Sequence, residues 1–276
     1  MIRLGSIEFE RPAVMGVLNV TPDSFSDGGR FASLDDALRQ AEQMAKDGAA
    51  IIDVGGESTR PGAAAVDDQQ ELERVLPVIA ALCTNLDIPV SVDTSKPVVM
   101  REAVAVGATL INDVCALQAE GAMQAAVELQ QPVCLMHMQG LPRTMQDNPH
   151  YDDVIADVTD FLAARMAECV AAGLGEDLIM VDPGFGFGKT VTHNIELLGN
   201  LRQLQALGRP ILIGVSRKST LGALTGRAVD DRLAAGIAAA ALAVDRGADV
   251  VRTHDVAATV DALKVAQAIG EKDKRL

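Results

Sequence analysis

Eight short apolar segments recur along the chain, and nearly all of them end in a polar or charged residue. Each is an unbroken run of β-branched and aliphatic residues, which is typical of strands buried on both faces of a parallel sheet. The segments are residues 14–20, 50–54, 89–92, 109–111, 133–136, 178–181, 211–215 and 250–251. Eight such strands predict an α/β protein, a closed (β/α)8 TIM barrel in which the carboxyl ends of the strands line one mouth. Polar residues at these ends predict an enzyme.

Amphipathic, alanine-rich segments alternate with the apolar runs and predict the helices of the barrel. We expect helices over residues 34–47, 67–82, 97–106, 121–129, 151–172, 194–207, 230–246 and 257–269. Such a barrel takes about 250 residues, so 276 residues predict one domain over 1–276. Two alternating triplets around Gly5 and Ser6 predict an N-terminal β-hairpin that plugs the amino-terminal end of the barrel.

Composition narrows the classes of protein that the barrel can represent. The sequence has no apolar stretch of membrane-spanning length and no secretory leader, so we expect a cytoplasmic protein with no membrane partner. A net charge of −14 disfavours nucleic-acid binding. The four cysteines lack CxxC spacing, and we expect buried reduced thiols instead of a zinc site or disulfides. They are Cys83, Cys115, Cys134 and Cys169.

Asp93, Asn112 and Asp182 each follow an apolar segment. Taken singly, an aspartate or asparagine at such a position serves equally well to cap the next helix, and capping is the better interpretation of Asp93 or Asn112 alone. Their coincidence at one barrel mouth favours a binding site. Two carboxylates and an amide suit a planar heterocycle with several N–H donors and an acceptor, such as guanine or a pterin.

Residues 182–190, with the sequence DPGFGFGKT, superficially resemble a phosphate-binding P-loop. The GxxxxGK[ST] spacing requires glycine where Pro183 stands, and proline has no N–H group to offer phosphate, so a nucleotide triphosphatase is excluded. The glycines instead allow a tight turn that places Phe185 or Phe187 against a flat ligand. Packing of both rings in the core is an equally open alternative.

Cations at three strand ends predict an anion site in this acidic chain. They are Arg60 in the second loop, Arg217 and Lys218 after the seventh strand, and Arg252 and His254 after the eighth. Barrels often bind phosphate near the last two of these loops, where a helix N-terminus adds N–H groups, and residues 216–220 supply such a helix start. For Arg217 we favour a surface ion pair with a helix carboxylate. His254 follows Arg252 by two residues on the same face, which favours a functional role.

Five segments together resemble the dihydropteroate synthase family. They are NVTPDSFSDGG (19–29), DVGGESTRPG (53–62), DPGFGFG (182–188), SRKS (216–219) and RTHD (252–255), and they span nearly the whole chain in order. The resemblance implies an enzyme of folate biosynthesis that joins 6-hydroxymethyl-7,8-dihydropterin pyrophosphate to 4-aminobenzoate and releases pyrophosphate. It also implies a (β/α)8 barrel, Mg²⁺, a homodimer and inhibition by sulfonamides.

The resemblance assigns roles residue by residue. Pterin binding falls to Asp93, Asn112, Met136, Asp182, Phe187, Gly214, Lys218 and Arg252. Pyrophosphate falls to Asn19, Arg60, Arg252 and His254, with Asn19 also reaching the metal. The 4-aminobenzoate site falls to Phe25, Thr59, Pro61, Lys218 and Ser219, and the catalytic roles fall to Asp27, Asp93, Asp182, Lys218 and Arg252. Cys115 receives no role.

Two other functions share part of this pattern. A methyltransferase that uses a methylated folate could have the barrel with Asp93, Asn112 and Asp182, but it would not need the anion site of Arg60, Arg252 and His254. A non-catalytic pterin-binding paralogue is the second alternative, and the intact loop motifs argue against it. The segment 230–246 is apolar nearly all round, which favours a homodimer contact, although packing on neighbouring helices explains it almost as well.

Overall fold

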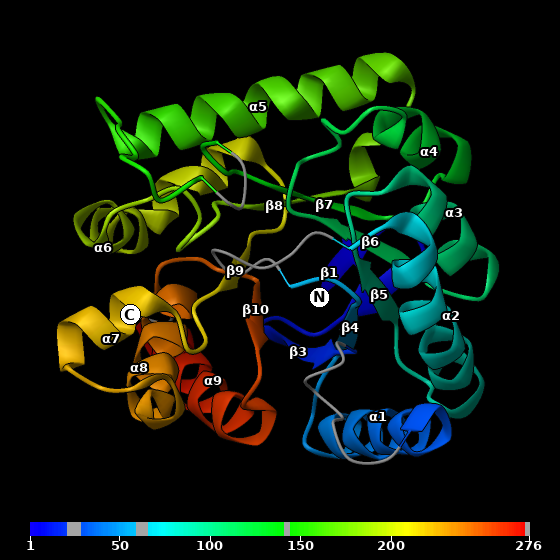
Figure 1. The fold of residues 1–276 in the computed structure, drawn as a ribbon. Coiled ribbons are helices and arrows are strands. Elements are labelled where there is room, and N and C mark those ends of the chain that lie inside the picture. Colours follow the sequence, from blue (N-terminus) through cyan, green and yellow to red (C-terminus); the bar gives the residue numbers. More distant parts are fainter. Residues whose placement is uncertain (21–28, 59–65, 141–143, 274–276) are drawn as a thin grey trace.

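Helices surround a ring of parallel strands in the computed structural model of the chain (Figure 1). The structure describes residues 1–20, 29–58, 66–140 and 144–273, without the side chains of residues 29–33 and 271–273. The barrel strands are β3 (Ala13–Asn19), β4 (Ile51–Gly55), β5 (Val90–Asp93), β6 (Leu110–Asp113), β7 (Val133–Met136), β8 (Ile179–Asp182), β9 (Leu212–Gly214) and β10 (Val250–Thr253). The predicted apolar segments are therefore confirmed as strands, with ends moved by one or two residues.

Every neighbouring pair in this sheet is parallel, and the order is β8-β7-β6-β5-β4-β3-β10-β9. The two outer strands meet through a bridge between Val181 and Ile211, and the Val181 amide donates to the carbonyl of Pro210 at 3.0 Å. This contact closes the sheet into the predicted TIM barrel. Because both faces of each strand are covered, most of their residues are buried and apolar, as the continuous runs predicted.

The outer helices follow the strands along the chain. They are α1 (Gly29–Lys46), α2 (Asp68–Asn85), α3 (Pro97–Ala105), α4 (Ala122–Leu129), α5 (Val154–Ala172), α6 (Val191–Gly199), α7 (Ser219–Thr225), α8 (Leu233–Asp245) and α9 (Val256–Asp273). Short 3₁₀ segments lie at Glu176–Leu178, Leu201–Leu207 and Val229–Asp231. The connections contain the left-handed glycines that end several helices, such as Gly173 after α5.

Two helix predictions are corrected by local chain chemistry. The segment 194–207 was expected to be one helix, but α6 begins at Val191 because Thr190 and His193 form a reciprocal cap there, and a 3₁₀ segment follows Asn200. The segment 230–246 was also expected to be one helix, but it consists of a 3₁₀ turn over Val229–Asp231 followed by α8.

The predicted N-terminal hairpin is confirmed, with β1 (Ile2–Leu4) antiparallel to β2 (Ile7–Phe9). Its inward residues join a small core with barrel-lining side chains such as Met15 and Leu212. The Gly5 amide donates to the carbonyl of Asp177 at 3.2 Å, which anchors the turn. The hairpin therefore closes one end of the barrel, as predicted, and leaves the carboxyl ends of the strands for a site.

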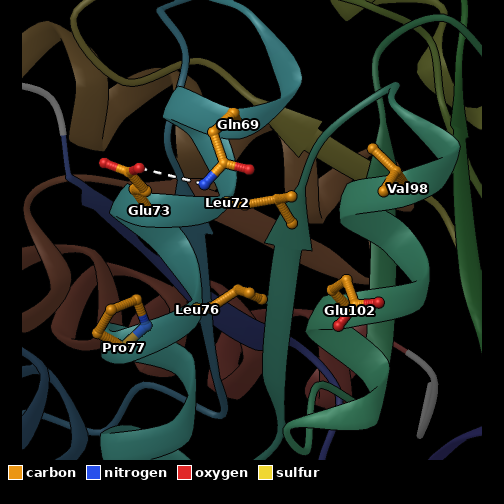
Figure 2. A pocket seen from close by; sticks show the side chains of 7 residues that line it. All are labelled: Gln69, Leu72, Glu73, Leu76, Pro77, Val98 and Glu102. Carbon is orange, nitrogen blue, oxygen red and sulfur yellow. Dashed lines mark hydrogen bonds between the residues drawn. The ribbon is translucent and has the colours of Figure 1, made fainter.

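A surface groove of about 420 Å³ lies between α2 and α3 (Figure 2). Its lining residues are Gln69, Leu72, Glu73, Leu76, Pro77, Val98 and Glu102. All of them belong to the two outer helices, so among the described residues the groove contains no side chain from the strand ends. Among the helices that the structure describes, none is long and apolar enough to span a membrane.

Candidate active site

The barrel brings Asp93 and Asn112 side by side, because these residues are register partners at the ends of β5 and β6. Asp93 also faces a cation from another strand of the mouth. Arg252 on β10 donates from Nη2 to Asp93 Oδ2 at 2.7 Å, across 159 residues of sequence. The predicted coincidence of strand-end groups is therefore present in space.

Asp53 lies at the centre of this network. Its side chain is fully buried, and its Oδ2 accepts from Arg252 Nε at 2.6 Å and from Asn112 Nδ2 at 3.0 Å. Its other oxygen, Oδ1, has no hydrogen-bond partner among the described residues. Sequence reasoning gave Asp53 no role in the site. The available signal was a carboxylate inside the apolar run of β4, since a buried charge requires a partner.

The carboxyl groups of the mouth are shifted toward their neutral forms. Burial raises the pKa of Asp93 to about 7, against the opposing effect of Arg252. Burial also raises the pKa of Asp182 to about 6, although the Gly184 amide, which donates to Oδ1 at 2.7 Å, and Lys218 both favour the charged form. Burial therefore outweighs the neighbouring cations in setting the pKa of both groups.

Arg252 and Lys218 respond in opposite directions to the same surroundings. Burial disfavours the charge of Arg252, but Asp53 and Asp93 raise its pKa above the usual value, so it stays a cation. Burial lowers the pKa of Lys218 to about 8, and Arg252 lowers it further, while Asp182 opposes both. Lys218 is therefore the more easily neutralised of the two cations.

The glycine-rich loop after β8 presents one aromatic ring to the site and buries the other. Phe185 is 2 % exposed and belongs to the main core, so core packing is its role. Phe187 is partly exposed, and the Lys218 ammonium lies 3.8 Å from the centre of its ring. A cation over a ring face at this distance is attractive. Of the two predicted rings, only Phe187 is placed beside a site residue.

Other predicted residues occupy the same end of the barrel. Met136 is the register partner of Asp182, and Gly214 is the register partner of Arg252. Asn19 ends β3, and an ideal Cβ added to the adjacent Gly55 would lie 3.6 Å from both Asn19 Oδ1 and Asp93 Cβ. Asn19 and Asp93 therefore approach Gly55 from the two strands that flank β4.

The cationic residues after β9 and β10 make two kinds of contact: an ion pair and a hydrogen bond to a hydroxyl group. Arg217 donates to Asp255 from Nη2 at 2.7 Å, which is the predicted ion pair with a carboxylate next to a helix. His254 Nδ1 lies 3.1 Å from Ser216 Oγ, so the ring is held near the start of α7. Ser219 is exposed as the first residue of that short helix. His254 and Ser219 therefore stand at the rim of the mouth.

The hydrogen bonds that satisfy the turns after β5 and β6 come from the neighbours of Asp93 and Asn112, and not from these two residues. Asp113 accepts from the amides of Cys115 and Leu117 at 2.8 Å each and from the Ser95 hydroxyl. The Thr94 hydroxyl accepts from the Lys96 amide at 3.2 Å. Because these neighbours satisfy the turns, Asp93 and Asn112 remain directed toward Arg252 and Asp53.

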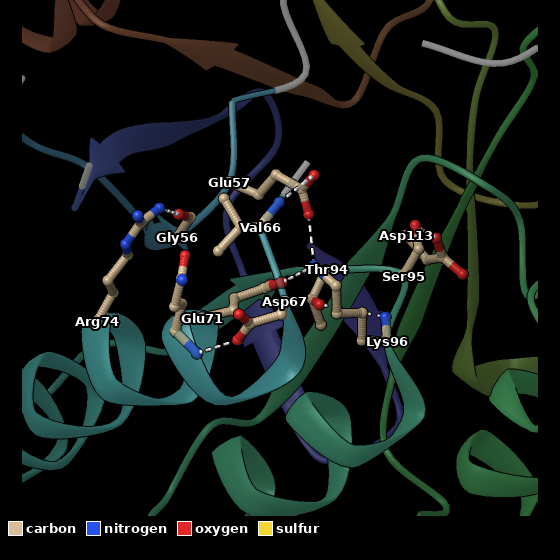
Figure 3. A network of polar contacts seen from close by, with 11 residues as sticks. Gly56, Glu57, Val66, Asp67, Glu71, Arg74, Thr94, Ser95, Lys96 and Asp113 are labelled. Carbon is tan, nitrogen blue, oxygen red and sulfur yellow. Dashed lines mark hydrogen bonds and ion pairs between the residues drawn. The ribbon is translucent and has the colours of Figure 1, made fainter. Parts of the chain in front are cut away.

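A charged network holds both ends of the loop between β4 and α2, residues 56–67 (Figure 3). Glu57 accepts from the Val66 amide at 3.3 Å, and its other oxygen accepts from the Lys96 ammonium. Lys96 also donates to Glu71, which is 1 % exposed. The Arg74 guanidinium donates to the carbonyl of Gly56 at 2.8 Å. Sequence reasoning did not identify this network, which joins the loop to α2 and to the connection before α3.

Several predicted residues lie outside the described part of the chain. They are Phe25, Asp27, Thr59, Arg60 and Pro61. Their assignments to the 4-aminobenzoate, pyrophosphate and catalytic sites stay predictions.

The described residues contain no group of three or more His, Cys, Asp or Glu side chains that could hold a metal ion by themselves. The side-chain oxygen of Asn19, which was predicted to reach the metal, nevertheless suits Mg²⁺, which commonly takes one or two protein oxygens together with substrate phosphates. The donor set therefore fits a magnesium ion that arrives with a phosphorylated substrate.

Comparison with known proteins agrees with this geometry. Residues 15–254 match the family of pterin binding enzymes. The dihydropteroate synthase of Haemophilus influenzae is 54 % identical over 262 residues, which cover 95 % of each chain. A structure of Yersinia pestis dihydropteroate synthase with a sulfonamide drug superimposes with a TM-score of 0.92 at 48 % identity, covering 96 % of this chain and 98 % of the other. The Xanthomonas albilineans dihydropteroate synthase in complex with 7,8-dihydropteroate gives 0.87 at 48 % identity, covering 95 % of both chains. The chain belongs to the pterin binding enzymes and, within them, to the dihydropteroate synthase family.

Proposed function

We propose that the chain joins 6-hydroxymethyl-7,8-dihydropterin pyrophosphate to 4-aminobenzoate and releases pyrophosphate, in folate biosynthesis. The observation that carries this function is the network of Asp53, Asp93, Asn112 and Arg252 at the barrel mouth of a dihydropteroate synthase family member. The Xanthomonas albilineans relative is a complex with 7,8-dihydropteroate, the molecule that this reaction forms.

The pterin is recognised through its polar edge and its flat faces. Asp93 and Asp182 accept from its N–H groups, and Asn112 supplies both a donor and an acceptor. Met136, Phe187 and Gly214 form the slot for the ring, Arg252 stacks across it, and Lys218 contacts its edge. The burial of Asp93 and Asp182 supports this role, because buried acceptors strongly favour a ligand that satisfies them.

The reaction needs no nucleophile from the protein. The bond between the methylene carbon and the pyrophosphate oxygen breaks, and its electron pair leaves with pyrophosphate. The neutral amine of 4-aminobenzoate then forms the C–N bond with its lone pair and loses a proton afterwards. The carbon becomes cationic between these events, so Asp93 and Asp182, joined by Asp27, stabilise the pterin cation electrostatically.

The leaving pyrophosphate requires positive charge at the rim of the mouth. Arg60, Arg252 and His254 bind its oxygens, and Asn19 contributes a ligand for Mg²⁺. When bound, Mg²⁺ neutralises the charge that develops on the leaving group. The position of Asn19 at the end of β3 and the contact of His254 with Ser216 before α7 support this placement.

The second substrate binds beside the pterin. Phe25, Thr59, Pro61, Lys218 and Ser219 border 4-aminobenzoate. The Yersinia pestis relative is a complex with a sulfonamide drug, and sulfonamides share the aniline ring of 4-aminobenzoate, so they inhibit by competing for this position.

The assembly is a homodimer built on α8. Leu233, Ala234, Ala238 and Leu242 are exposed on this helix, and Leu242, in its last turn, is 47 % exposed. An exposed apolar stripe on a barrel helix favours contact with a second copy. Light scattering at micromolar concentration is expected to give the dimer mass, and the monomer mass alone would contradict the assignment.

We also propose a cytoplasmic location, which the four free cysteines support.

The decisive measurement is pyrophosphate release by the purified protein with both substrates and Mg²⁺. We expect turnover that requires 4-aminobenzoate and falls at least about tenfold in Lys218→Ala, because a buried charged contact is lost. No release in the wild type would indicate a non-catalytic paralogue. Methyl transfer from a methylated folate without pyrophosphate release would indicate the methyltransferase.

A further inference from the structure

Lys189 is a buried lysine that the reaction described above does not use. Its side chain is 2 % exposed, and it stands between the glycine-rich loop and α6. Burying an ammonium group is unfavourable unless each of its protons has an acceptor. Because this cost is borne next to the pterin slot, the contacts of Lys189 indicate what it does there.

The Lys189 ammonium has three close acceptors, and the carbonyl oxygen of His137 lies further from Nζ, at 3.5 Å. Nζ lies 2.9 Å from His137 Nδ1, 3.0 Å from the carbonyl oxygen of Gly184 and 3.1 Å from that of Phe187. When Lys189 is charged it only donates, and Nδ1 of His137 then accepts while the ring proton lies on Nε2. Lys189 therefore folds back and joins the first part of its own loop to the end of β7.

The loop has very little freedom around this centre. Gly184 has a φ of +70°, and a Cβ built there would lie 1.8 Å from the carbonyl oxygen of His137. Gly188 has a φ of +57°, and its Cβ would lie 2.5 Å from the carbonyl of Gln139. The loop backbone thus packs directly on the segment after β7, and Lys189 occupies the space between them.

Two groups assigned to the pterin are held by this loop. The Gly184 amide donates to Asp182 Oδ1 at 2.7 Å, so the loop orients that carboxylate. Phe187 places its ring 3.8 Å from the Lys218 ammonium. Two of the three carbonyls bonded by Lys189 belong to Gly184 and Phe187, the residues that contact Asp182 and Lys218.

We propose that Lys189 is a positioning residue for the pterin slot, acting through the backbone of residues 184–188. The inference rests on the proposed function, since it assigns the slot to a pterin. Lys189 does not touch the substrate; it fixes the distance between the Asp182 carboxylate and the Phe187 ring, and with it the width of the slot.

The electrostatic surroundings of Lys189 agree with this role. Burial lowers its pKa to about 7, and Lys218 lowers it further, while Asp182 opposes both. Burial, and then the charge of Lys189, lowers the pKa of His137 to about 3, so the imidazole stays neutral and accepts. Tyr151 completes the enclosure, with its ring centre 5.9 Å from Nζ and its hydroxyl donating to the carbonyl of Gly188 at 2.7 Å.

The test compares Lys189→Met with Lys46→Met, which removes an exposed lysine from the end of α1. The probe is 6-hydroxymethylpterin, and its Kd is measured by calorimetry alongside Tm, kcat and the KM for both substrates. We expect Lys189→Met to raise the pterin Kd about tenfold or more, the equivalent of one buried charged contact. The KM for 4-aminobenzoate should stay near the wild-type value, and Lys46→Met should match the wild type throughout.

Each result separates one explanation from another. A pterin Kd within about twofold of the wild type in a folded Lys189→Met protein overturns the positioning role, since twofold is less than one contact. A lower Tm with both substrates weakened equally also overturns it, because that pattern is a general loss of structure. If Lys189→Met does not fold, Lys189→Gln, which keeps an amide donor, must show the same selective loss of pterin affinity. A wild-type protein that binds no pterin refutes the proposed function, and the inference with it.

Discussion

Removing Arg252 is expected to unbalance the buried charges of the mouth in a way that stability measurements can resolve. The substitution Arg252→Met keeps most of the side-chain volume but deletes two charged hydrogen bonds, to Asp53 at 2.6 Å and to Asp93 at 2.7 Å. Charged hydrogen bonds contribute about 1.5–3 kcal/mol each, and leaving a buried charge unpaired costs about 3–5 kcal/mol. We therefore expect the free energy of unfolding to fall by about 3–5 kcal/mol at pH 8.

The loss should shrink at pH 5. Arg252 lowers the pKa of Asp93, which burial already raises to about 7, so its removal raises the folded-state pKa further. A carboxyl group whose folded pKa lies above its unfolded value stabilises the fold at low pH, and that contribution disappears as pH rises through the folded pKa. The unpaired Asp93 carboxyl group of the variant is thus neutral at pH 5, and its ionisation lowers the free energy of unfolding as the pH rises toward 8.

A double variant tests whether Asp53 is the source of the cost. Asp53→Asn removes the fully buried negative charge while keeping the shape of the side chain. Added to Arg252→Met, it should restore about 1–3 kcal/mol of stability at pH 8, because the two sites are directly coupled. Pyrophosphate release should stay lost in the double variant, since the pterin contact of Arg252 is not restored. Urea unfolding measures the first quantity. A double variant no more stable than Arg252→Met would refute the reasoning.

Three further outcomes are expected. Gly184→Ala should give little soluble protein, because its Cβ would meet the His137 carbonyl oxygen at 1.8 Å in a backbone with positive φ; normal solubility and Tm would contradict the loop packing. Sulfonamides should compete with 4-aminobenzoate, and they should bind weakly when pyrophosphate and Mg²⁺ are absent. The variants Phe25→Leu and Pro61→Ser should weaken sulfonamide binding more than substrate binding. Calorimetry measures the affinities and inhibition kinetics the competition, and equal sulfonamide affinity without pyrophosphate would contradict ordered binding. Binding of 6-hydroxymethylpterin at pH 7 should release protons, which calorimetry in buffers of different ionisation enthalpy detects.

The barrel could be predicted because its strands carry their signal locally. A parallel strand buried on both faces is an unbroken apolar run, and such runs located β3 through β10 with small errors at their ends. Helix boundaries were less certain where a side chain sets them. The reciprocal cap of Thr190 and His193 starts α6 three residues before the expected position, and this cap uses a histidine in place of the usual glutamate or glutamine.

The site was predictable to the extent that each residue ends a strand. Asp93, Asn112 and Asp182 were found in this way, and the register of β5 and β6 places the first two side by side. Asp53 was not assigned, because its role depends on partners 59 and 199 residues away that only the closed barrel brings together. Lys189 was missed for a related reason, since its sequence context suggested a phosphate loop while its side chain folds back under its own backbone.

The charges of the barrel mouth explain why we expect protons to be released, and not taken up, when the pterin binds. Among the described residues, Asp93 and Asp182 are buried, and the cations Arg252, Lys218 and Lys189 offset only part of the effect of burial on these two carboxyl groups. Burial raises the pKa of Asp93 to about 7 and that of Asp182 to about 6, so near pH 7 part of the protein carries a proton on Asp93. A pterin that donates N–H groups to these carboxylates stabilises their charged forms and expels the proton. Once charged, the same two carboxylates favour a methylene carbon that turns cationic as pyrophosphate leaves. Proton uptake on binding would mean that the pterin does not meet these carboxylates, and the electrostatic account of the reaction would fail with it.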